Sequence, residues 1–163
     1  MGNFNRNTFR KIFDNNNFEP IRIHCDFSYL KKKVQNNQNL LSIEKEVENS
    51  INNSIKIIKK LINIRPLTYP INKITLNDLS EWGFDSNYID KLLLTNGNGI
   101  NADLVILLKF IEQNEQSLLL DNEMASISNK FILDEETKRP IVGVIYINNN
   151  INMNIENINI YLQ

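Results

Sequence analysis

Residues 40–63, LLSIEKEVENSINNSIKIIKKLIN, place apolar side chains three and four positions apart, with lysine and glutamate between them. This spacing predicts an amphipathic helix of about five turns. The helix should end near Ile64, because Pro66 disfavours helical backbone at Arg65. A helix with one apolar side needs a second layer to pack against, and this requirement restricts the fold more than any other segment does. The apolar positions are Leu40, Ile43, Val47, Ile51, Ile55, Ile58 and Leu61 or Ile62.

Four segments have the pattern of β-strands and could supply that second layer. Residues 21–27 alternate apolar and polar side chains, which is typical of a half-buried strand. Residues 104–108 and 141–147 are continuous apolar runs, as expected of strands covered on both faces. Residues 125–132 alternate weakly and are more polar, which favours a strand at the edge of a sheet. The order of helix and strands predicts an α/β fold with one sheet.

We divide the chain into a polar N-terminal arm, residues 1–19, and one domain, residues 20–163. The arm could contain a short helix around residues 8–13. The connection KKKVQNNQN, residues 31–39, is expected to be polar loop, and its three lysines to be solvated. Near the end of the chain, Ile155, Ile158 and Leu162 have helical spacing and predict the start of a helix.

Composition and charge exclude several classes of function. The net charge is -1, which gives no electrostatic support for non-specific nucleic-acid binding, and we expect no nucleic-acid partner. No apolar run reaches the roughly 18 to 20 residues that cross a bilayer, so no transmembrane segment is expected. The single histidine, His24, excludes a metal site built from several imidazoles, and the single cysteine, Cys25, excludes an internal disulfide. The five glycines form no phosphate-binding loop.

Four phrases resemble the leishmanolysin family of zinc metalloendopeptidases, and they occur in the family's order. They are EPIRIHCDFSYL, the amphipathic helix followed by INIRPL, INADLVILLKF, and DEETKRPIVGVIYIN. The last phrase is the most specific. Together they extend from Glu19 to Asn148. The resemblance therefore covers most of the chain except its N-terminal arm.

The resemblance implies a metzincin-like N-terminal subdomain. Such a subdomain has a twisted mixed sheet with one antiparallel edge strand and a long backing helix. It also implies peptide-bond hydrolysis by zinc-activated water. In the family, the strand after R-P-I-x-G leads into a helix that carries H-E-x-x-H, in which two histidines bind zinc and the glutamate activates water. ENINIYLQ, residues 156–163, resembles the lead-in to that helix.

No H-E-x-x-H occurs in the sequence, so we assign no catalytic residue and no metal ligand to it. We expect no zinc bound to this chain and no activity from it alone, with the C-terminal half of the family's domain as the missing partner. Family members usually carry disulfide cysteines in this half and are surface-anchored or secreted. Here Phe131 stands where one cysteine is expected, and the compartment stays unassigned.

The weakly alternating segment, residues 125–132, matches the edge strand on which the family binds extended substrate. Ser126, Ser128 and Lys130 are therefore the candidate substrate-binding residues. The alternative function is a stand-alone, non-catalytic α/β domain that binds a peptide or partner protein at the same edge.

Several single residues have structural interpretations. Cys25 is expected to be buried, with His24 toward solvent. Arg139 is expected to pair with a carboxylate, and Pro140 to begin a strand. Trp82 should belong to the core. If no helix covered the final strand, Val142, Val144 and Tyr146 or their neighbours would be exposed, and the chain would then be marginally stable or aggregate.

Overall fold

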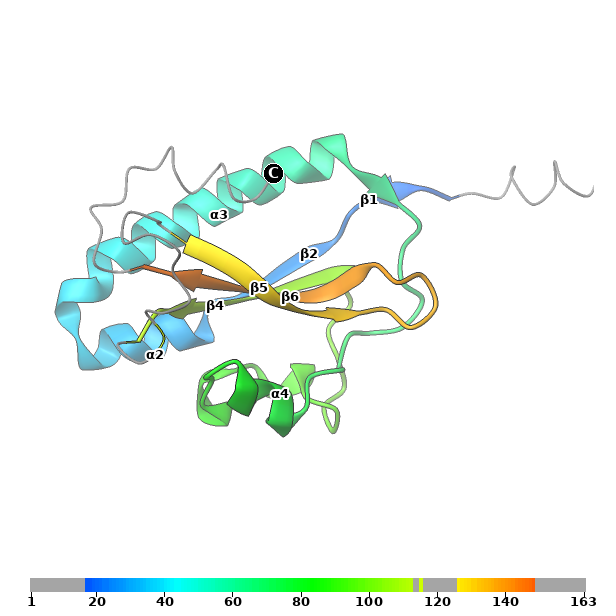
Figure 1. Cartoon of the computed structure of the whole chain (residues 1–163). Helices are drawn as coiled ribbons and strands as arrows, with labels where there is room; N and C mark the ends of the chain where they lie inside the picture. The colour runs from blue at the N-terminus through cyan, green and yellow to red at the C-terminus, as the bar shows by residue number, and fades with distance from the viewer. Residues whose placement is uncertain (1–16, 113–114, 116–125, 149–163) are drawn as a thin grey trace, which may run out of the picture.

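The computed structural model describes residues 17–112, 115 and 126–148. These residues form a four-stranded sheet in the order β2-β4-β6-β5. The strands β2, β4 and β6 are parallel, and β5 is antiparallel to β6 at one edge. This confirms the predicted α/β fold with a mixed sheet (Figure 1). The strands are β2 (Ile23–Asp26), β4 (Leu104–Phe110), β5 (Ser126–Leu133) and β6 (Pro140–Ile147).

The long helix α3 (Leu41–Leu61) covers one face of the sheet, as Figure 1 shows. Its buried apolar side chains, Val47, Ile51 and Ile55, belong to the core, as the spacing predicted. The helix ends at Leu61, three residues before the predicted end near Ile64, because the backbone becomes extended at Ile62. We call this side of the sheet the helix face; it includes Cys25 and the strand residues that pair with it across the sheet, Ile106 and Gly143.

A second helix, α2 (Ser28–Asn36), occupies the segment expected to be polar loop. The prediction was wrong because Tyr29, Leu30 and Val34 share one helical side and are all buried, although three lysines separate them. The Asp26 carboxylate accepts a hydrogen bond from the Ser28 backbone N–H at 2.8 Å, which helps to start the helix directly after β2. A short 3₁₀ turn, η1 (Gln38–Leu40), connects α2 to α3.

The segment between α3 and β4 covers the other side of the sheet, which we call the loop face. It begins with β3 (Asn63–Ile64), which pairs with β1 (Glu19–Pro20). It continues through α4 (Leu76–Glu81), η2 (Ser86–Tyr88) and η3 (Lys91–Leu93). Thr75 caps α4 in a capping box with Asp78. Trp82, only 5% exposed, is a core residue as predicted.

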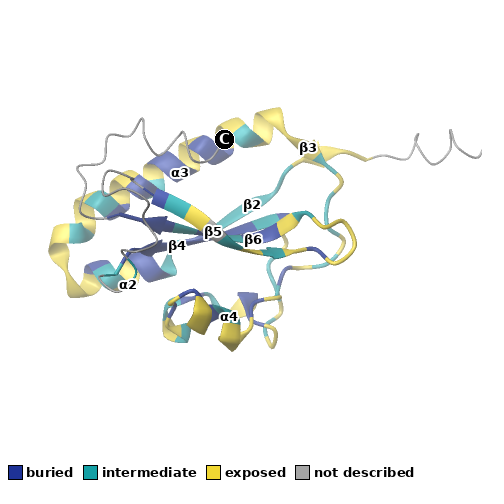
Figure 2. Ribbon diagram, in the orientation of Figure 1, coloured by how far each residue is buried: buried dark blue, intermediate teal, exposed yellow. Residues whose placement is uncertain are grey.

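The final strand is covered on the loop face and more open on the helix face (Figure 2). Val142, Val144 and Tyr146 are fully buried, and the Tyr146 hydroxyl donates to the Trp82 carbonyl at 3.1 Å. Of the residues that the prediction named, these three are covered, and the closing helix on which it depended lies outside the described residues. Their neighbours on the helix face are more open. A Cβ built on Gly143 would meet nothing within 4 Å, and Phe131, which pairs with Gly143, is 59% exposed.

A cluster of charged residues joins the starts of the three parallel strands. Asp103 precedes β4 and accepts hydrogen bonds from Arg22 Nε and Nη2, both at 2.9 Å, and from the Leu67 backbone at 2.7 Å. Arg139, just before β6, places Nη2 3.6 Å from Asp103 Oδ1, which confirms its expected structural pairing. Pro140 begins β6, also as expected. We call Arg22, Asp103 and Arg139 the strand-start cluster.

Several predictions fall on residues outside those described. They are the helix within the N-terminal arm and the closing helix with Ile155, Ile158 and Leu162. Within the described ranges, no helix has the length and apolarity needed to cross a membrane.

Candidate peptide-binding edge and its pocket

The strand β5 has one partner in the sheet, β6, and so forms the edge of the described structure. In an antiparallel pair, backbone N–H and C=O groups on alternate residues point away from the partner strand. These groups can accept an additional strand, which is how extended peptides bind to sheet edges. An eight-residue edge strand such as β5 is long enough to hold several residues of a peptide in this way.

A β-bulge between Ile127 and Lys130 separates the three candidate residues of β5. Ser126 pairs with Ile147 and Lys130 with Val144. Because these partners are three residues apart on β6, Ser126 and Lys130 lie on opposite faces of the sheet. Ser126 is 3% exposed, Lys130 is half-buried and Ser128 is exposed. The structure therefore does not bring the three side chains together on one surface, and the sequence pattern gave no sign of the bulge.

The turn from β5 to β6 is fixed by Asp134. Its carboxylate accepts hydrogen bonds from the Thr137 backbone N–H at 2.7 Å and from the Thr137 hydroxyl at 2.6 Å. Its backbone N–H donates to the Arg139 carbonyl at 2.8 Å, and Lys138 adopts a positive φ of 58°. The charged residues 134–139 thus form a turn, which begins directly after the last residue of β5.

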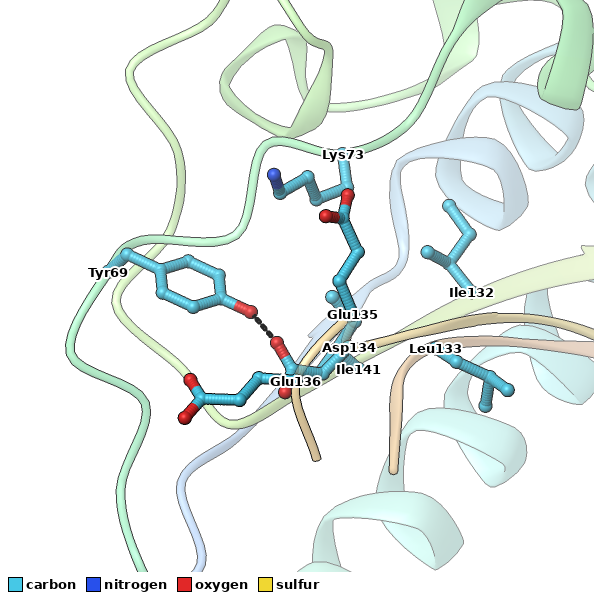
Figure 3. A pocket seen from close by; sticks show the side chains of 8 residues that line it. All are labelled: Tyr69, Lys73, Ile132, Leu133, Asp134, Glu135, Glu136 and Ile141. Carbon is cyan, nitrogen blue, oxygen red and sulfur yellow. Dashed lines mark hydrogen bonds between the residues drawn. The ribbon is translucent and has the colours of Figure 1, made fainter. Parts of the chain in front are cut away.

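A pocket of about 310 Å³ lies between this turn and the extended segment after β3. Figure 3 shows the Tyr69 ring on one side and the side chains of the β5 end and the turn on the other. The Tyr69 hydroxyl donates to Asp134 Oδ1, which joins the two walls. We call this the turn pocket; it is lined by Tyr69, Lys73, Ile132, Leu133, Asp134, Glu135, Glu136 and Ile141.

The charged side chains around the turn pocket differ in whether they bond to other groups of the protein. Hydrogen bonds from the Thr137 side chain, the Tyr69 hydroxyl and the Thr137 backbone lower the pKa of Asp134 to about 2. Burial and the hydrogen bond to Asp134 raise the pKa of Tyr69 to about 12. Glu135, Glu136 and Lys73 are exposed, and among the described contacts none of them forms an ion pair.

The described residues do not fit a catalytic zinc ion. Across residues 17–112, 115 and 126–148, no group of three or more His, Cys, Asp or Glu side chains is placed to hold a metal. His24 and Cys25 lie on opposite faces of β2, because they pair with the successive residues Val105 and Ile106. Burial raises the pKa of the Cys25 thiol to about 12, although Cys25 is half-buried rather than fully buried as predicted. His24 was expected to face solvent, but it is also half-buried, on the loop face with Val105 and Val142.

Comparison of the chain with protein-family models, with curated proteins and with solved structures found no match.

Sequence reasoning located the edge strand and missed the pocket beside it. Tyr69 lies in an extended segment between Pro66 and Pro70, and the sequence gave no reason to place it against the turn. One available signal was the run of three carboxylates, Asp134 to Glu136, immediately after a strand. A second signal was an aromatic residue held between two prolines, where the backbone is restricted.

Proposed function

We propose that this chain forms the substrate-binding sheet of a leishmanolysin-like zinc metalloendopeptidase and binds an extended peptide along β5. The observation that carries the proposal is that, among the described residues, β5 pairs with β6 alone and forms an antiparallel edge of the sheet. The four sequence phrases that resemble the family support it, since they contain β2, β4, β6 and the long helix, and β5 lies between the third and the fourth phrase.

The proposal assigns peptide binding to the described sheet and assigns zinc and hydrolysis to a C-terminal half of the family type. The described residues offer no zinc site, so no hydrolytic step is derived from them. Reading the coding sequence beyond Gln163 tests this division. An in-frame H-E-x-x-H within about ten codons supports the protease assignment, and a stop codon there contradicts it.

A second candidate function is a stand-alone domain that binds peptides without cleaving them. It is favoured by one observation: the edge strand and the turn pocket both lie among the described residues and need no metal to form. The two candidates share the binding step and differ in chemistry. The purified 163-residue chain, supplied with zinc and fluorescent casein, should show no turnover under either candidate. Stoichiometric zinc uptake with turnover would contradict both.

The binding step is tested with a peptide of high β-propensity and with the same peptide N-methylated on alternate residues. Methylation removes the N–H groups that would pair with β5 and leaves every side chain in place. We expect the unmethylated peptide to bind the chain and the methylated one to lose at least tenfold in affinity, about 1.4 kcal/mol. Equal binding of the two peptides would contradict strand addition.

A further inference from the structure

We propose that the turn pocket binds the side chain of a lysine or arginine in the peptide added to β5. This inference rests on the proposed strand addition and specifies which peptides the edge prefers. The pocket begins at Ile132 and Leu133, the last two residues of β5, and continues into the turn. A peptide that runs along β5 therefore passes the pocket, and one of its side chains can enter.

The walls of the pocket suit a long, unbranched side chain. Ile132, Leu133 and Ile141 supply apolar surface from the two strands, and the Tyr69 ring supplies it from the opposite wall (Figure 3). The methylene stem of lysine or arginine can pack along such surface while its charged end stays in water. A volume of about 310 Å³ accommodates one such side chain and leaves room for solvent at its charged end.

The charges at the pocket favour a positive group. Asp134, Glu135 and Glu136 carry three negative charges on one wall, against one positive charge from Lys73. Asp134 is already occupied by Thr137 and Tyr69, whereas Glu135 and Glu136 form no ion pair with the described residues. These two carboxylates are therefore available to a ligand.

The Tyr69 ring adds a further preference for a cation. The Nζ of Lys73 lies 5.8 Å from the centre of this ring, so a ligand ammonium group would take this place by displacing the exposed Lys73 side chain. Tyr69 keeps its ring in place through the hydroxyl bond to Asp134, so the face does not need to be ordered when a ligand binds. Among the lining residues, an acidic peptide side chain would have only Lys73 to pair with and three carboxylates to repel it.

The inference is tested with a set of host peptides that bind to β5. One lysine is moved through each position of the peptide, and each lysine peptide is compared with the peptide carrying norleucine at that position. Norleucine keeps the stem and removes the charge. We expect one position at which lysine binds about tenfold more tightly than norleucine, from a part-exposed ion pair and a cation–π contact together. The difference should shrink in high salt.

The double variant Glu135→Gln, Glu136→Gln is the matched test on the protein side. It should reduce the preference, taken as the ratio of the variant's own affinities for the lysine and norleucine peptides, from about tenfold to about twofold, which is what the contact with the Tyr69 ring would leave. A preference of equal size at every position would indicate attraction by overall charge and would overturn the inference, as would no preference at any position or a preference for glutamate. In these cases the host peptide still binds. Failure of the host peptide to bind at all would instead overturn strand addition itself.

Discussion

Asp103 and Asp134 are both buried carboxylates just before or after a strand, and each has a pKa of about 2. Burial alone would raise the pKa of Asp103, but hydrogen bonds from Arg22 and from the Leu67 and Arg22 backbone outweigh it. Asp134 is held by uncharged donors, from Thr137 and Tyr69. The cluster at the strand starts thus uses its positive charges within the fold. In the turn pocket the one lining cation, Lys73, lies over the Tyr69 ring, and neither it nor Glu135 and Glu136 forms an ion pair with the described residues.

The largest effect should come from removing Asp103. The Asp103→Ala variant leaves Arg22 without its carboxylate and three strand starts without their common partner. We expect the free energy of unfolding to fall by about 3–5 kcal/mol, the usual cost of breaking a buried ion pair. Urea unfolding followed by circular dichroism measures it. The control is Glu46→Ala, an exposed carboxylate on α3, with an expected change within about 0.5 kcal/mol. Similar losses in both variants would show that Asp103 has no special role.

Acid should reduce the stabilising contributions of Asp103 and Asp134 in the same pH range. The pKa values of Asp103 and Asp134 fall from an ordinary 3.8 to about 2 on folding. Their contribution to stability is therefore present above about pH 4 and is lost as the pH falls from there toward 2. We expect the urea midpoint to drop across this range, and to drop less steeply in Asp103→Asn and in Asp134→Asn. A midpoint that does not change between pH 5 and pH 2 would contradict both pKa shifts.

Removing the hydroxyl that joins the two pocket walls should cost less than removing Asp103. Tyr69→Phe deletes one hydrogen bond to Asp134 and leaves the two from Thr137. We expect a loss of about 1 kcal/mol in the free energy of unfolding. Tyr88→Phe is the matched control, since Tyr88 is also half-buried and its ring packs edge-on against Tyr29. If Tyr88→Phe lowers the free energy of unfolding by as much, the hydrogen bond between Tyr69 and Asp134 makes no specific contribution to stability.

The smallest effect on stability is expected at the carboxylates that we assign to the ligand. Glu135→Gln with Glu136→Gln should change the free energy of unfolding by less than about 0.5 kcal/mol, because both side chains are exposed and in no described ion pair. Thermal unfolding of the double variant checks this. A large loss of unfolding free energy would show that Glu135 and Glu136, like Asp103, are needed to stabilise the fold.

The parts of the fold that the sequence predicted are those with strong local patterns. The continuous apolar run of β4, the one-sided helix α3 and the strand start at Pro140 are each determined by neighbouring residues. The helix α2 was missed because three consecutive lysines separate its buried residues in the sequence and make the segment look like a polar loop. The bulge in β5 and the pocket were missed because they depend on pairing with β6 and on Tyr69, which is distant in the chain.

The central claim is that a peptide joins the sheet at β5, and amide hydrogen exchange of the ¹⁵N-labelled chain tests it most directly. Spectra are compared with and without the host peptide. We predict that exchange slows at alternate residues of β5, between Ser126 and Leu133, while β2 at the other edge is unchanged. Slowed exchange along β2, or bound peptide with no change in β5, would contradict the account.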